Sequence, residues 1–187
     1  ANPRLQVEHT VTEAITGVDL VQLQLLIASG NTLDDLNINE PPPPKGYAIQ
    51  CRINMETISK KGMFKPSGGV ISVYEPPNGP GIRVDGVGYA NYETSTRYDS
   101  LLAKLITHSS ASDYATAVHK AYRALTQFRL EGFEVNIPFL MNLLSSEDFT
   151  SNQIYTRYVD EHMEKLVKKD IHPAMYHTKQ NIEEAVE

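Results

Sequence analysis

SLLAKLITHS, residues 100–109, is a short run rich in apolar and β-branched residues, the composition typical of a buried strand. Three runs of the same kind precede it, YAIQCRINM (47–55), GGVISVYE (68–75) and GIRVDG (81–86), and turns rich in glycine and proline separate them. Four candidate strands in succession, with no helix between them, predict an antiparallel sheet.

Helical periodicity begins after these strands. SDYATAVHKAYRALTQFRL predicts an amphipathic helix with Ser112 or Asp113 as its N-cap. Its expected apolar face consists of Ala115, Val118, Ala121, Tyr122, Leu125 and Phe128. EGFEVNI (131–137) is a further candidate strand, and Asn136 is expected to cap a helix with Pro138 in its first turn. The sequence therefore predicts an α+β fold, with a mostly antiparallel sheet flanked by helices.

The N-terminal stretch ANPRLQVEHT alternates polar and apolar residues, and this alternation predicts the end of a strand over residues 2–8. Thr10 or Thr12 is expected to cap a short helix. Glu13 lies three residues after Thr10, as in a capping box.

A second helix is expected in DLVQLQLLIAS, with Asp19 as its N-cap and Gly30 as its stop. The four consecutive prolines at 41–44 are incompatible with a helix or a central strand, so they predict a stiff extended linker. Beyond about residue 160 the chain is polar and aperiodic. We therefore expect an N-terminal unit over residues 1–40 and a proline-rich linker over 41–46. A main domain over 47–155 and a tail, or a linker to a further domain, over 156–187 are expected to follow.

Composition excludes several classes of function. The net charge is −6 and the pI about 5.5, and no basic run exceeds two residues, so nothing indicates binding to nucleic acid. No apolar stretch has membrane-spanning length, and no signal peptide is recognisable. Cys51 is the single cysteine, which rules out an internal disulfide, and we expect it to be a small buried residue. A reducing compartment fits, so we expect a cytoplasmic protein or, alternatively, one of the mitochondrial matrix.

The polar residues of the first stretch suggest a site. Arg4 offers a planar fork of donors suited to bicarbonate or carboxylate, Glu8 is a candidate general base, and the Asn2 oxygen is a weak ligand for a hard cation. Arg83 in GIRVDG is a second candidate, because glycines on both sides permit close approach of a ligand. The alternative interpretation is that both stretches are surface strands carrying ordinary ion pairs. Arg52 is a further strand arginine to which the same two interpretations apply.

In their order along the chain, these segments resemble biotin carboxylases. NPRLQVEHTVTEAITGVDLV resembles the signature at the end of the ATP-grasp core in that family. YAIQCRINMET, FKPSGGVI, GIRVDG, YDSLLAKLI and RLEGFEVNIPFLMNLL follow in the order that the C-terminal domain of the family shows them. The resemblance covers about residues 1–150 and implies a remnant of an ATP-grasp core followed by a biotin carboxylase C-terminal domain.

The resemblance implies an ATP-dependent ligase that activates bicarbonate to carboxyphosphate and carboxylates biotin held on a carrier domain. By this resemblance Glu8 is the base, while Arg4, Gln6 and the Val7 backbone bind bicarbonate. The resemblance also implies that Arg83 stabilises the biotin enolate and that Asn2 lies near Mg²⁺ or Mn²⁺. The implied partners are a biotin carboxyl carrier domain, a carboxyltransferase and a second copy of the chain.

Some parts of the family pattern are missing from this sequence. A glutamate metal ligand is expected two positions before Asn2, and the ATP-binding lysines and glycine-rich loop are expected upstream of it. We therefore expect residues 1–187 alone not to cleave ATP. Gly68 replaces a proline common in relatives, and the usual threonine before Asn136 is absent.

Two other functions are compatible with the sequence. The chain could be a subunit-assembly module without catalytic residues of its own, or part of a carbamoyl-phosphate-type ATP-grasp ligase. The acyl acceptor is not encoded in these motifs.

Overall fold

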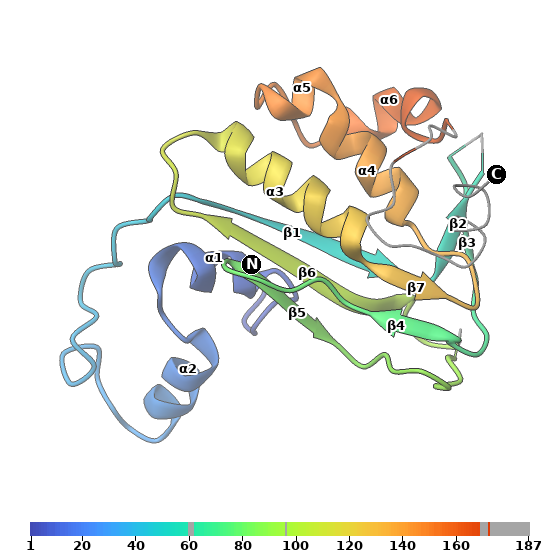
Figure 1. Ribbon diagram of the computed structural model, residues 1–187. Coiled ribbons are helices and arrows are strands. Elements are labelled where there is room, and N and C mark those ends of the chain that lie inside the picture. Colours follow the sequence, from blue (N-terminus) through green and yellow to red (C-terminus); the bar gives the residue numbers. More distant parts are fainter. Residues whose placement is uncertain (60–61, 96, 169–171, 173–187) are drawn as a thin grey trace.

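The computed structural model describes residues 1–59, 62–95, 97–168 and 172, and it centres on a three-stranded antiparallel sheet (Figure 1). The strand order is β1 (Tyr47–Asn54), β6 (Leu101–Ser109) and β5 (Ile82–Gly86). Two short antiparallel pairs accompany it: β2 (Glu56–Ile58) with β3 (Phe64–Pro66), and β4 (Val73–Glu75) with β7 (Arg129–Glu131). The predicted α+β fold with an antiparallel sheet is confirmed.

One face of the central sheet is apolar and carries the core. Alternate residues of the three strands, among them Ile53, Leu105 and Val84, pack in one cluster with α3 (Tyr114–Gln127). The helix α4 (Ile137–Ser145) packs beside α3, also contacts β1, and adds Met141 and Leu144 to the same cluster. Because side chains alternate along a strand, the intervening residues face the opposite side, where α1 (His9–Thr16) contacts β1 and β6.

Helix α3 begins as predicted but buries a wider face. Asp113 is its N-cap and accepts a hydrogen bond from the Thr116 backbone N–H at 2.8 Å. Ala117 and Ala124, absent from the predicted face, are fully buried, because α3 packs against both the sheet and α4. Their small side chains suit a helix that is packed closely on two sides.

The N-terminal stretch differs from the prediction. Residues 2–8 contain no strand, since within the described chain no neighbouring strand pairs with them. The capping box is also wrong. Glu8 occupies the N-cap position of α1 without a side-chain cap, and Thr10 is buried and donates to Gln50 Oε1 at 2.5 Å. Glu13 accepts from the Leu20 backbone N–H at 2.9 Å.

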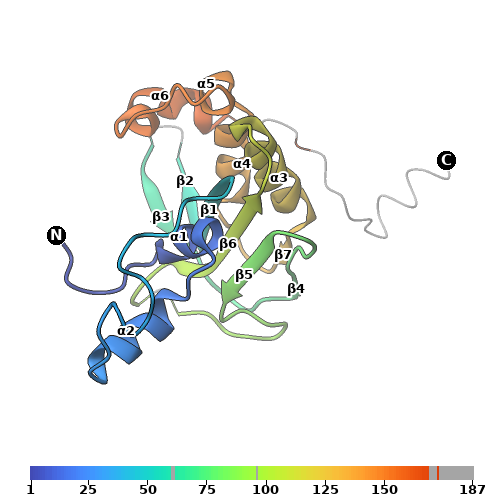
Figure 2. The same cartoon turned by 90° about the vertical axis from the view of Figure 1, so that its left-hand side faces the viewer.

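The second helix, α2 (Leu20–Ala28), matches its prediction more closely. Asp19 caps it by accepting from the Gln22 backbone N–H at 2.8 Å, and Gly30 follows the last turn with a φ of +103°. Figure 2 shows α2 projecting away from the sheet. Among the described residues no single helix meets the length and hydropathy expected of a membrane span. Taken together across a 100° bend, α1 and α2 do meet that test by length and composition.

Residues 41–44 form neither helix nor strand, as predicted, and the following residue ties them to α1: the Lys45 N–H donates to Ile15 O at 2.8 Å. The division of the chain into domains stays a prediction. Two short helices, α5 (Glu147–Thr150) and α6 (Tyr158–Leu166), follow α4, and Tyr158 and Leu166 are buried. The rest of the predicted tail, 169–171 and 173–187, lies outside the described residues.

Three strand predictions need correction. Only residues 73–75 of GGVISVYE form a strand, and the strand expected at 131–137 is found at 129–131, where β4 provides its partner. The β2–β3 hairpin was not expected, because Pro66 and the following turn residues disguise its second strand. Cys51 is buried as predicted, and burial raises the pKa of its thiol to about 12.

Asn136 occupies the N-cap position of α4, with Pro138 in the first turn, as predicted. Its side chain makes no cap hydrogen bond, however, and joins α4 to β1 instead. It accepts from the Asn54 backbone N–H at 2.8 Å and donates to Arg52 O at 3.0 Å. We expect Asn136→Ala to lower the free energy of unfolding by about 1–3 kcal/mol, since it leaves two backbone groups without their partner. Urea denaturation measures this difference.

The matched control is Asn78→Ala in an exposed turn, which should change stability by no more than about 0.5 kcal/mol. Equal stability of the two variants would contradict the assignment of Asn136 as the link between α4 and β1.

Candidate functional site

The second face of the central sheet is polar. Arg52 on β1, Lys104 on β6 and Asp85 on β5 lie opposite one another in register and form one row across the three strands. The neighbouring row on the same face contains Gln50, Ile106 and Arg83. Along β5, Ile82 and Val84 pack into the core while Arg83 and Asp85 point the other way.

The N-terminal segment lies against this polar face through four contacts. Glu8 Oε2 pairs with Arg52 Nη2 at 3.0 Å, and both side chains are about half exposed. The carbonyl of Val7 accepts from Lys104 Nζ at 3.2 Å. The other two contacts are the Thr10–Gln50 hydrogen bond and an ion pair of Glu13 with Arg83 at 3.0 Å. These contacts join residues 40 to 97 positions apart in the sequence.

Arg83 uses its whole guanidinium. Its Nε and Nη2 donate to the two oxygens of Asp85 at 2.7 and 2.9 Å, and Nη1 donates to Glu13 Oε2 at 3.0 Å. The hydrogen bonds to Asp85, and then the one to Glu13, raise the pKa of Arg83 above its usual value despite its partial burial. Arg83 is therefore a fixed cation at a defined position.

Asp85 also forms an ion pair with a second cationic side chain, that of Lys104. Lys104 Nζ lies 3.4 Å from Asp85 Oδ2 and has a side chain only 13 % exposed. Burial alone would raise the pKa of Asp85, but the hydrogen bonds and charges of Arg83 and Lys104 outweigh it and hold that pKa below its ordinary value. Asp85 is thus an ionised link between Arg83 and Lys104.

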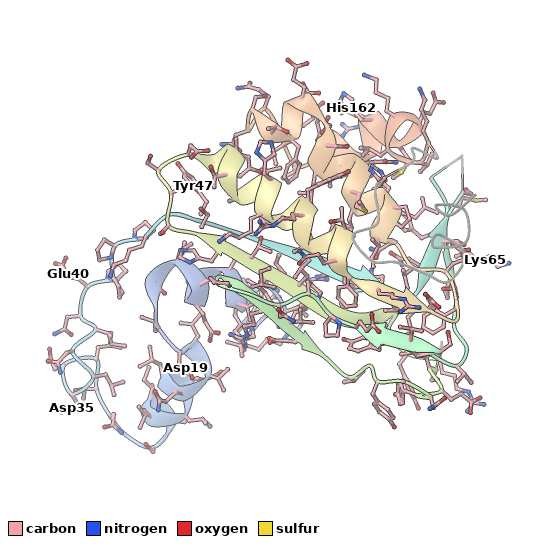
Figure 3. The ribbon with its side chains drawn as sticks, in the orientation of Figure 1. Asp19, Asp35, Glu40, Tyr47, Lys65 and His162 are labelled. Atoms are coloured by element: carbon pink, nitrogen blue, oxygen red, sulfur yellow. The ribbon has the colours of Figure 1, made fainter. Side chains whose placement is uncertain are left out.

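A cavity of about 380 Å³ opens beside this network, between α1, the start of α2 and the strands β5 and β6. Its polar lining includes Arg83, Glu13, His108 and Asp19. Figure 3 shows Asp19 beside α2, while Asp35 and Glu40 lie farther out on the loop before β1. The cavity places the Arg83–Glu13 pair at a surface that a small molecule can reach.

The predicted residues are brought together only in part. Asn2 and Arg4 are exposed, and among the described residues no ion pair includes Arg4. Gln6 is half-buried, and its carbonyl lies 2.6 Å from His9 Nδ1. Glu8 and Arg83 are not paired with each other, since Arg52 and Glu13 are their respective partners. In the described part of the chain no group of three or more His, Cys, Asp or Glu side chains could hold a metal ion.

Sequence reasoning missed Glu13 and Lys104 as members of this network. The signal for Lys104 was available, because a lysine interrupts the apolar run LLAKLIT at the parity that faces away from α3. Glu13 carried no such signal, since its spacing from Thr10 equally fits a capping box.

Comparison with known proteins identifies the class of this fold as the biotin-dependent carboxylases. The family described as the biotin carboxylase C-terminal domain matches residues 50–161, and the ATP-binding domain of the carbamoyl-phosphate synthase L chain matches residues 1–36. The chain belongs to the biotin carboxylase C-terminal domain family.

Similar proteins are carboxylases of greater length. Pyruvate carboxylase 1 of Caenorhabditis elegans is 47 % identical over 165 residues, which are 87 % of this chain and 14 % of that protein. Biotin carboxylase 1 of Bacillus subtilis is 45 % identical over 85 % of this chain and 34 % of its own length. The solved biotin carboxylase domain of a thermophilic 2-oxoglutarate carboxylase bound to bicarbonate has a TM-score of 0.78 at 40 % identity, covering 91 % of this chain and 37 % of that one. The chain thus spans between a seventh and about a third of these relatives.

The lowered pKa of Asp85 predicts a pH dependence of stability. Because its folded-state pKa lies below the unfolded value of about 3.9, the carboxylate contributes stability above about pH 4 and loses it as the pH falls through the folded pKa. Asp85→Asn should therefore cost about 1 kcal/mol at pH 7, allowing for the solvent exposure of Arg83, and progressively less below pH 4.

Urea denaturation of both proteins between about pH 7 and pH 2.5 measures this difference. Asp160→Asn, an exposed position on α6, serves as the control. A difference between wild type and Asp85→Asn that is constant across the pH range would contradict the role given to this ion pair.

Proposed function

We propose that this chain is the C-terminal part of a biotin carboxylase that carries out ATP- and bicarbonate-dependent carboxylation of biotin on a carrier domain. The observation that carries the proposal is the shared network on the polar sheet face. It connects the backbone at Val7, beside the candidate base Glu8, to Arg83 through Lys104 and Asp85. Membership of the biotin carboxylase C-terminal domain family supports the same reaction.

In this proposal the N-terminal segment handles bicarbonate. Arg4, exposed and outside the described ion pairs, offers its fork to the planar anion, helped by Gln6 and the backbone at Val7. Glu8 removes the proton of bicarbonate while the bicarbonate attacks ATP. The ion pair with Arg52 uses Oε2, one of the two carboxylate oxygens of Glu8, and both side chains remain accessible from solvent.

Arg83 is proposed to stabilise the biotin enolate. A developing enolate needs a permanent positive charge that is already in place, and the bidentate contact with Asp85 supplies that preorganisation. The cavity beside Arg83 and Glu13 provides access from solvent. For the enolate to reach Nη1 of Arg83, it has to displace the Glu13 carboxylate, which holds that nitrogen.

ATP and its Mg²⁺ or Mn²⁺ are proposed to be held mainly by other parts of the polypeptide. Among the described residues only the Asn2 amide is offered as a metal contact, and one amide oxygen does not make a site. We accordingly expect residues 1–187 alone not to cleave ATP. The proposed partners are a biotin carboxyl carrier domain, a carboxyltransferase and a second copy of the chain. The proposed compartment is the cytoplasm or the mitochondrial matrix.

The test is Glu8→Gln in the complete biotin carboxylase that contains this chain. Loss of a general base should lower biotin- and bicarbonate-dependent ATP cleavage by at least about 100-fold, with an unchanged circular dichroism spectrum. Glu147→Gln, an exposed position in α5, is the control and should retain full activity. Near-normal turnover of Glu8→Gln would remove the residue from the bicarbonate site.

The Arg83→Met variant distinguishes a catalytic role of this chain from a role in subunit assembly alone. If Arg83 acts on biotin, carboxylation should fall by about 100-fold or more while the oligomeric state, measured by light scattering, stays the same. Arg123→Met, on the exposed side of α3, is the control. Altered assembly with retained turnover would instead favour the module. Bicarbonate-dependent ATP cleavage that is indifferent to biotin would favour a carbamoyl-phosphate-type ligase.

A further inference from the structure

We propose that Lys104 is a positioning residue that sets the separation between the bicarbonate segment and the biotin arginine. The inference rests on the proposed function and assigns a role to a residue that touches neither substrate. Lys104 lies in the middle of β6, the central strand of the sheet. Its ammonium contacts both the carbonyl of Val7 in the N-terminal segment and the carboxylate of Asp85, which also binds Arg83.

The ammonium is connected to both the bicarbonate segment and Arg83 by one or two polar contacts. On one side Nζ donates to Val7 O at 3.2 Å, and this carbonyl belongs to the residue between Gln6 and Glu8. On the other side Nζ lies 3.4 Å from Asp85 Oδ2, the oxygen that also accepts from Arg83 Nη2 at 2.9 Å. A displacement of the ammonium is therefore passed directly to both candidate substrate sites.

A purely structural role does not explain a lysine at this position. Ile106, two residues along the same strand and on the same sheet face, is only 2 % exposed, so this face accepts an apolar side chain. Burying an ammonium to 13 % exposure costs desolvation free energy that a well-packed apolar residue would not incur. The lysine is better explained by the geometry that it imposes on Val7 and Asp85.

The chemistry makes this separation important. Bicarbonate and ATP yield ADP and carboxyphosphate, which splits into CO2 and phosphate. Once the N1 proton of biotin has passed to a base such as this phosphate, N1 of the resulting enolate forms a bond to the CO2 carbon. CO2 that is released too far from the enolate diffuses away, so that ATP is cleaved without carboxylation of biotin. An error of about 1 Å in such an arrangement can cost on the order of 100-fold in rate.

The experiment compares three variants of the complete biotin carboxylase, with free biotin as the acceptor. Lys104→Met keeps the length and apolar stem but removes the ammonium, and Lys104→Arg restores a cation able to reach both oxygens. Lys120→Met is the matched control. Like Lys104, Lys120 makes two contacts through its ammonium, here with the main-chain carbonyls of Pro80 and His108, and neither carbonyl belongs to the N-terminal segment. The readouts are the ATP cleaved per biotin carboxylated, the KM for ATP and the thermal unfolding midpoint.

For Lys104→Met we expect carboxylation to fall about 10- to 100-fold, and the ATP cleaved per carboxylated biotin to rise at least about 5-fold, with the KM for ATP unchanged. Lys104→Arg should restore most of the coupling, and Lys120→Met should keep the wild-type ratio. A loss of activity that follows only the folded fraction, with an unchanged ratio, would overturn the inference. So would equal uncoupling in Lys120→Met. A wild-type enzyme without biotin- and bicarbonate-dependent ATP cleavage would overturn the proposed function itself.

Discussion

The row Arg52–Lys104–Asp85 across the central sheet is the constraint on which the site depends. Charged side chains on a sheet face that is partly covered must be paired, because desolvation of an unpaired charge is costly. Lys104 and Asp85 satisfy each other, and the N-terminal segment supplies the remaining partners: a carboxylate for Arg52, a carbonyl for Lys104 and a second carboxylate for Arg83. The polar sheet face therefore fixes where the N-terminal segment lies.

Stability and chemistry are divided between the two faces of one sheet. The apolar face is buried under α3 and α4 (Figure 1) and supplies most of the core. The polar face carries Arg52, Arg83, Asp85 and Lys104, the charged strand residues of the candidate site. Alternation along β5 shows the division within four residues: Ile82 and Val84 belong to the core, and Arg83 and Asp85 belong to the network. A rigid core thus holds the functional groups without sharing residues with them.

The sequence predicted the elements governed by local rules better than those governed by distant contacts. The strand GIRVDG and the Asp113 and Asp19 caps follow from alternation and from hydrogen bonds to N–H groups three residues away, and all are found in the structure. The strand over residues 2–8 and the capping box at Thr10 failed, because Gln50, Arg52 and Lys104 compete for these side chains and carbonyls. No local pattern near Glu8 could indicate partners 44 and 97 residues away from this segment.

The charge balance of the network constrains how an anion can enter. Three cations, Arg52, Arg83 and Lys104, face three carboxylates, Glu8, Glu13 and Asp85, so the described network is electrically neutral. An anionic substrate gains little from a neutral cluster unless it displaces a carboxylate or meets a further cation. Arg4 lies just before the network in the chain, is exposed, and forms none of the described ion pairs. In the proposed reaction Arg4 is therefore available to attract bicarbonate, whereas Arg83 would become available to an enolate only when Glu13 is displaced. This order suits a reaction in which the anion binds before the enolate forms.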